Sequence, residues 1–106
     1  MKRVKRRYLA LTIDSREAFG SNEFMHAVWA AVSRLYGEYG ASRTGLSLIG
    51  YNGERKLVIL RTVHTTLGMV RTALASITKI EGKPTAVHVL AVSGTLKALH
   101  QKIDRA

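Results

Sequence analysis

The 106-residue sequence has no cysteine, few acidic side chains and no long apolar run. Without cysteine it has neither a disulfide framework nor thiolate chemistry. A membrane-spanning helix needs about 18 or more consecutive apolar residues, and every apolar stretch here is much shorter. The apolar segment behind the basic N-terminus is also too short for a signal peptide. We therefore expect a soluble, cytoplasmic protein that does not enter a membrane.

Positive charge dominates what is present. Lys and Arg number 17 against seven Asp and Glu, which gives a formal net charge of +10 at pH 7. A compact chain tolerates such self-repulsion best beside a polyanion, and nucleic acid releases counterions when its phosphates are neutralised. An anionic membrane surface is the main alternative, and composition does not separate RNA from DNA. The charge therefore favours a nucleic-acid partner.

Hydrophobic periodicity and turn residues predict seven elements behind a basic arm at residues 1–6. In order, these are a strand at 8–13, a helix at 21–36, strands at 46–51 and 56–63, a helix from 65 or 66 to 81, a strand at 85–92 and a helix opened by 93–95. The first six follow the split β-α-β pattern. The predicted fold is α+β: one ferredoxin-like (RRM-like) domain over 1–106, with a four-stranded antiparallel sheet and an extra C-terminal helix.

Several residues mark the expected boundaries. Ser21 is expected to cap the first helix and Gly37 to end it, followed by a loop at 40–45. Asn52-Gly53 is the strongest short hairpin signal that a sequence offers. Gly82 is expected to end the second helix.

Two of the predicted strands are apolar on both faces. In the strand at 56–63, Ile59 would face one side and Leu60 the other. In the last strand, simple alternation places Val92 on the same face as His88, and it predicts a buried or half-buried histidine. Two helices cover only one face of a sheet, so the third helix, a partner protein or both must cover the other.

No catalytic or metal-binding constellation is apparent. The four histidines are scattered, and a solvated loop explains Asp14 and Glu17 better than acid–base catalysis does. RRM domains stack bases on aromatic side chains of the first and third strands. Here the first strand offers Tyr8 but the third has no aromatic residue. We therefore expect no catalytic residue and no metal ligand, with phosphate and shape recognition by Arg and Lys.

The candidate phosphate contacts come from the arm, the loop after the first helix, the hairpin and the start of the last helix. At that helix start, backbone N–H groups and the helix dipole suit an anion. The candidates are Lys2, Arg3, Lys5, Arg6, Arg7, Arg43, Arg55, Lys56, Ser93, Thr95 and Lys97. Ordinary helix capping and a solvated basic face are the alternative explanations.

The first helix carries two apolar stripes, although one is enough to pack a helix on a sheet. Phe24, Val28, Ala31 and Leu35 form the first stripe, and Met25, Trp29, Val32 and Tyr36 form the second. The second stripe is either the margin of a wide core face or a protein interface anchored by Trp29.

Several segments resemble the ribonuclease P protein component 2 family, which occurs in archaea and has a eukaryotic relative. The similarity runs from Arg7-Tyr8-Leu9 to the last helix. Its more specific segments are Leu35-Tyr36-Gly37-Glu38-Tyr39-Gly40, Ile49-Gly50-Tyr51-Asn52 and Val92-Ser93-Gly94-Thr95-Leu96-Lys97. None is a catalytic signature, and together, in this order, they are specific.

The resemblance implies an RRM-like fold with an added helix and a non-catalytic role in ribonuclease P, which removes the 5′ leader from precursor tRNA. The RNA subunit would perform the metal-dependent hydrolysis. The protein would stabilise that RNA and raise its affinity for substrate and Mg²⁺, without binding a cofactor itself.

The resemblance also implies a TIM-barrel-like protein partner, in a heterodimer or heterotetramer. The double-striped first helix and the two-sided sheet are where that contact is expected. Two other functions stay open: a different small ribonucleoprotein component, such as a ribosomal protein, and a ligand-sensing ferredoxin-like regulatory domain.

Overall fold

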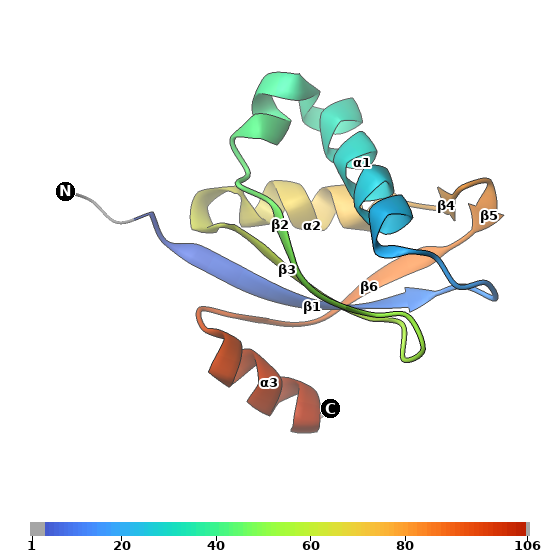
Figure 1. The fold of residues 1–106 in the computed structure, drawn as a ribbon. Helices are drawn as coiled ribbons and strands as arrows, with labels where there is room; N and C mark the ends of the chain where they lie inside the picture. The colour runs from blue at the N-terminus through green and yellow to red at the C-terminus, as the bar shows by residue number, and fades with distance from the viewer. Residues whose placement is uncertain (1–3, 106) are drawn as a thin grey trace.

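The computed structural model describes residues 4–105 and contains a four-stranded sheet with helices on both faces (Figure 1). The elements are β1 (Arg6–Asp14), α1 (Ser21–Ser42), β2 (Ser47–Asn52), β3 (Leu57–Val63), the 3-10 turn η1 (His64–Thr66), α2 (Leu67–Ala75), β4 (Lys79–Ile80), β5 (Lys83–Pro84), β6 (Ala86–Ser93) and α3 (Leu96–Arg105). The sheet order is β2-β3-β1-β6, and every pair is antiparallel. The predicted split β-α-β fold with an added C-terminal helix is confirmed.

The main core lies between one face of the sheet and the helices α1 and α2. Leu11 of β1 and Leu60 of β3 point to this face, and Phe24 and Val28 of α1 pack against them with no exposed surface. Each such side chain contributes about 1.5–3 kcal/mol through burial. Leu35, which the sequence places on the same stripe, is instead 43% exposed. The core-facing side of α1 is therefore centred between the two predicted stripes.

Helix α3 lies on the opposite side of the sheet from α1 and α2 (Figure 1). A second, smaller core lies between it and this face of the sheet. Leu99 is completely buried there against Ala10 of β1 and Ile59 of β3. The amphipathic face of α3 thus covers part of the second face, as its apolar spacing predicts. α3 packs mainly on β1 and β6. The part of this face that is formed by β2 and by the neighbouring part of β3 is therefore not covered by the helix.

A β-bulge changes which side chains of β6 face the main core. Ala10 pairs with Ala91 and Leu11 pairs with Val89, which leaves Leu90 without a partner on β1. A bulge of one residue reverses the alternation beyond it. The simple alternation predicted for this strand is therefore wrong, and Val92 packs against the main core.

His88 is exposed rather than buried or half-buried as predicted. It lies on β6, an edge strand, opposite Thr12 of β1. The second core is centred farther along the sheet, around Ala10 and Ile59. His88 is therefore exposed although its neighbours in the sequence are apolar, because the second core does not extend to this part of the edge strand.

A break at Gly37 divides α1 into two helical segments. At Gly37 the backbone adopts φ 75° and ψ 170°, which is not helical, so the first segment ends there as predicted. A second segment continues to Ser42, so the prediction of a loop from residue 40 is wrong. Glycine reaches this left-handed region without the steric cost that a side chain imposes. The second segment buries Ala41 in the core. The N-cap position is Gly20, with no side-chain cap, so the prediction that Ser21 caps the helix is also wrong.

The second helix is shorter than predicted, because it ends at Ala75. Residues 79–84 form the small β4–β5 hairpin, and Gly82, at φ 75°, lies in its turn and does not end a helix. Ile77 and Ile80 are buried although they lie beyond the helix. The apolar spacing of the sequence continues past the end of the helix because the non-helical chain that follows also places these two side chains in the main core.

Candidate nucleic-acid interface

The described part of the basic arm is held at one end of the sheet. β1 begins at Arg6, which lies opposite Val63 of β3. The backbone N–H of His64 donates to the carbonyl of Lys5 at 2.8 Å. Lys5 and Arg6 are exposed and Arg7 is half-buried. The last residues of the arm are therefore part of the sheet edge, and their charged ends stay at the surface.

The start of α3 lies beside this arm. Tyr8 pairs with Ser93, so the arm and the β6–α3 junction meet. The Oγ1 of Thr95 accepts a hydrogen bond from the N–H of Ala98 at 3.2 Å, so this side chain caps the helix, which was the alternative explanation for it. The Nη1 of Arg7 lies 3.5 Å from the position that a Cβ on Gly94 would occupy. The guanidinium of Arg7 therefore lies beside Gly94, in the short segment that leads into α3.

Arg43 belongs to the same end of the sheet. It follows α1 directly, and its guanidinium lies over the ring of Tyr39, 5.7 Å from the centroid. The next residue, Thr44, accepts a hydrogen bond from the N–H of Val63 at 2.8 Å. Because Val63 also pairs with Arg6, the loop that carries Arg43 is fixed near the arm.

Seven of the predicted contacts therefore gather at one end of the sheet, which we call the arm-end surface. It consists of Lys5, Arg6, Arg7, Arg43, Ser93, Thr95 and Lys97. Ser93 is only 8% exposed, so its side chain contributes to the shape of the junction more than to the surface. Lys2 and Arg3 lie outside the described residues.

The two hairpin residues lie at the opposite end of the sheet. The predicted hairpin is confirmed, with a turn at residues 53–56 whose tip carries Arg55 and Lys56. Strand β1 is nine residues long and separates the two ends by about 26 Å. The Nζ of Lys56 donates to the carbonyl of Ser15, whereas Arg55 is exposed. Lys56 therefore helps to hold a loop, and the structure does not bring the hairpin to the arm-end surface.

Sequence reasoning missed Arg61. It lies in the middle of the apolar run of β3, opposite Tyr8 of β1 and Ser47 of β2. The residue is half-buried, and its Nε has no hydrogen-bond partner among the described residues. A single charged residue within a strand of mostly apolar residues was the available signal.

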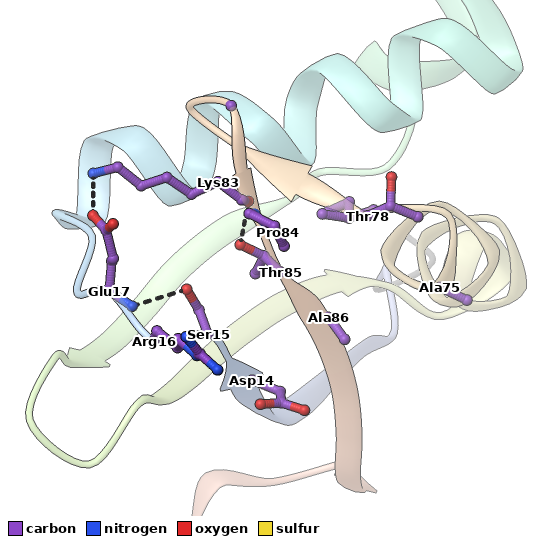
Figure 2. Close-up of a pocket in the computed structure, with 12 residues that line it drawn as sticks. Asp14, Ser15, Arg16, Glu17, Ala75, Thr78, Lys83, Pro84, Thr85 and Ala86 are labelled. Carbon is purple, nitrogen blue, oxygen red and sulfur yellow. Dashed lines mark hydrogen bonds and ion pairs between the residues drawn. The ribbon is translucent and has the colours of Figure 1, made fainter.

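A pocket of about 870 Å³ opens where the end of β1, the end of α2 and the β4–β5 hairpin meet (Figure 2). At its rim, the Nζ of Lys83 lies 2.6 Å from the carboxylate of Glu17, and this hydrogen bond and charge raise the pKa of Lys83. Asp14 and Arg16 also line the pocket. Charges of both signs meet here, so the pocket has no preference for a polyanion.

Among residues 4–105, no three His, Asp or Glu side chains are grouped so that they could hold a metal ion. No helix in the same range has the length and apolar character needed to cross a membrane. The arm-end surface brings cationic side chains to the backbone N–H groups at the start of α3, and both kinds of group suit an anion.

The second stripe of α1 divides into two environments. Val32 is completely buried in the main core and has no surface to offer a partner, so it cannot belong to an interface in this structure. Met25, Trp29 and Tyr36 are half-buried and pack against that core while part of each side chain reaches the surface. These three residues form what we call the α1 flank.

Comparison with known proteins gives consistent matches. Residues 7–104 match the sequence pattern of the Rpp14/Pop5 family. A protein from Methanosarcina mazei named ribonuclease P protein component 2 is 33% identical over 100 residues, which cover 94% of this chain and 84% of that protein. A protein of the same name from Pyrococcus furiosus is 32% identical over 100 residues, covering 94% and 83%.

A chain in the cryo-EM structure of yeast ribonuclease MRP has a similar fold, with a TM-score of 0.73. The sequence identity is 16%, and the match covers 99% of this chain and 95% of that chain. At this identity the likeness supports the fold.

Proposed function

Because the chain belongs to the Rpp14/Pop5 family, we propose that it is a protein subunit of ribonuclease P that binds the RNA of that enzyme. In this proposal the RNA performs the hydrolysis that removes the 5′ leader of precursor tRNA, with Mg²⁺ held by the RNA. The protein stabilises the folded RNA and raises its affinity for substrate and Mg²⁺.

The arm-end surface is the observation that carries the proposal. It combines the cationic side chains of Lys5, Arg6, Arg7 and Arg43 with the start of α3, which follows Ser93 and Thr95. Cationic side chains and backbone N–H groups at a helix start are the groups that contact phosphates in nucleic-acid complexes. Neutralising phosphates releases counterions, so binding should weaken steeply with salt.

The same proposal includes a protein partner for the α1 flank. Trp29 is the only tryptophan of the chain, and it stays partly exposed beside Met25 and Tyr36. Aromatic residues are enriched among the side chains that dominate protein interfaces. We infer that this flank contacts the TIM-barrel-like subunit of ribonuclease P, in a heterodimer or heterotetramer.

Charge reversal of the arm tests the proposal for RNA. We expect the triple variant Lys5→Glu, Arg6→Glu, Arg7→Glu to bind ribonuclease P RNA at least tenfold more weakly at fixed salt, because none of the three side chains could then pair with a phosphate. The dependence of log affinity on log salt should also become shallower, by about one in slope for each phosphate that the variant no longer neutralises. Filter binding over a salt series measures both quantities.

A matched control reverses three exposed cations elsewhere: Arg16, Arg71 and Lys79. This variant has the same net charge as the arm variant, so only the position of the charges differs. Equal reductions of affinity in the two variants would contradict a specific arm-end surface. Failure of the unaltered chain to bind the RNA in dilute buffer would overturn the proposed function itself.

A further inference from the structure

Part of the second sheet face lies outside the area that α3 covers. Leu57 and Arg61 of β3 share a face with Ile59, which meets α3, because residues two apart point to the same side of a strand. Ser47 lies opposite Arg61, and Gly50 lies opposite Ile59. We call Ser47, Gly50, Leu57 and Arg61 the open sheet half. Three of its four positions are apolar or small, and the fourth is the only charged one.

Arg61 lacks a counter-charge in the described part of the chain. Its cross-strand neighbours are Tyr8 and Ser47, neither of which is acidic. Among residues 4–105 the ion pair within 4 Å joins Lys83 and Glu17 at the other end of the sheet, and the Nε of Arg61 is buried without an acceptor. A partly desolvated guanidinium without a partner costs free energy that a bound anion would offset.

The open sheet half is continuous with the arm-end surface. Arg6 lies opposite Val63, and Tyr8, two residues later, lies opposite Arg61. Arg6 and Arg61 are therefore diagonal neighbours on the same face of the sheet. An anionic chain that contacts the arm would meet Arg61 next if it continued over β3 and β2.

From this geometry we propose that an RNA strand runs from the arm-end surface across the open sheet half, where Arg61 binds one of its phosphates. The inference rests on the proposed function and adds a second contact area to it. Charge complementarity favours RNA as the occupant. A second copy of this chain would bring another net charge of +10 to the same face, and repulsion would oppose that pairing.

The first test compares Arg61→Met with Arg71→Met in the assembled ribonucleoprotein. Arg71 is an exposed arginine of α2, which covers the opposite sheet face. We expect Arg61→Met to weaken RNA binding about tenfold and to lower the salt slope by about one. Arg71→Met should leave both unchanged. Similar affinities for the two variants would overturn the assignment of Arg61.

Thermal unfolding separates binding from a structural role. Methionine keeps a long apolar stem, and the substitution removes an N–H group that has no acceptor among the described residues. The melting temperature of Arg61→Met should therefore stay the same or rise. A fall in melting temperature that parallels the fall in affinity would mean that Arg61 acts only through the fold. Arg61→Lys, which keeps the charge but not the planar fork, should retain part of the affinity.

A second test locates the RNA directly. The chain has no cysteine, so Ser47→Cys provides a single attachment point for an iron–EDTA cleavage reagent on the open sheet half. Ala30→Cys, on an exposed position of α1, is the control. Hydroxyl radicals from position 47 should cut a short stretch of the RNA that the control leaves intact.

The outcomes distinguish the inference from the proposed function. Unaltered protein that binds the RNA while position 47 yields no cleavage would overturn the inference alone. Protection of the thiol in Ser47→Cys by a protein subunit in the absence of RNA would also overturn it, because the occupant would then be a protein. Absence of RNA binding by the unaltered chain would remove the proposed function as well.

Discussion

Cationic residues with the same formal charge have different roles in this structure. Lys56 and Arg55 are neighbours on one hairpin, yet the ammonium of Lys56 donates to the carbonyl of Ser15 while Arg55 is exposed. The guanidinium of Arg7 lies beside Gly94 and donates to the carbonyl of Arg6, and Arg61 has a buried Nε without an acceptor among the described residues. The role of each residue follows from the acceptors within reach of its side chain, which composition does not specify.

Trp29 provides a test of the protein interface at the scale of one residue. We expect Trp29→Ala to weaken binding to the TIM-barrel-like subunit by about tenfold or more, as for a hot-spot aromatic. Its effect on unfolding should be smaller than the about 3–5 kcal/mol of a fully buried tryptophan, because the side chain is only half-buried. Titration calorimetry and thermal unfolding measure the two effects on the same preparations.

Trp29→Phe serves as the conservative variant, since it keeps an aromatic ring at the α1 flank. It should restore most of the affinity. An intact complex formed by a severely destabilised Trp29→Ala chain would assign Trp29 to the core rather than to an interface.

At the scale of elements, α3 differs from the other helices because it has its own small core. Leu99 joins α3 to Ala10 and Ile59 on the second sheet face, while α1 and α2 share the main core on the first. A helix of ten residues is not stable alone in water, so its docking depends on this contact. Detaching α3 would also release the β6–α3 junction of the arm-end surface.

A pair of truncations separates the two cores. We expect Leu99→Ala and Leu74→Ala each to cost about 2–5 kcal/mol, because both side chains are at most 1% exposed. Leu99→Ala should undock α3 locally, whereas Leu74→Ala should destabilise the whole main core. Amide hydrogen exchange would then show fast exchange confined to α3 in Leu99→Ala and spread over α1, α2 and the sheet in Leu74→Ala. Uniform acceleration in both variants would mean that the two cores unfold as one unit.

At the scale of the whole molecule, the net charge of +10 acts on a domain that measures 45 × 36 × 19 Å. Repulsion within the free protein is strongest at low salt, where the Debye length is about 30 Å at 0.01 M and thus comparable to the molecule. On the proposed function, bound RNA would remove this repulsion and stabilise the folded state by mass action. Salt weakens both the repulsion and the RNA binding, so it affects the free and the bound protein in opposite directions.

The melting temperatures of the free and RNA-bound protein should therefore respond oppositely to salt. We expect the free protein to gain several degrees between about 0.01 and 0.2 M salt, which corresponds to roughly 1 kcal/mol for a domain of this size. The RNA-bound protein should lose stability over the same range as its affinity falls. Scanning calorimetry with and without RNA provides both curves, and parallel curves would contradict the role of charge proposed here.

Local patterns were sufficient to predict most of the fold. Alternation identified β1, the Asn52-Gly53 signal identified the β2–β3 hairpin, and the stripe that contains Leu99 identified α3 and the face it covers. These predictions succeeded because each depends on neighbours in the sequence and on a period of 2 or 3.6 residues.

Predictions that depended on distant contacts failed. Gly37 ends the first helical segment as predicted, but a second segment follows where a loop was expected and buries Ala41. The apolar spacing through Ile77 has the features of a longer helix, but a hairpin follows. In both places the shape of the core, and not the local signal, determined the backbone.

The sequence by itself determined the net charge, the absence of thiol chemistry, the order of the four main strands and three helices, and which residues carry positive charge. Only the tertiary structure decided which of those residues share a surface. Antiparallel pairing brings Lys5, Arg6 and Arg7 to the start of α3, and the length of β1 keeps Arg55 at the other end. The physical reason is that charge adds up along a chain regardless of its fold, whereas a binding surface depends on distances between residues far apart in sequence.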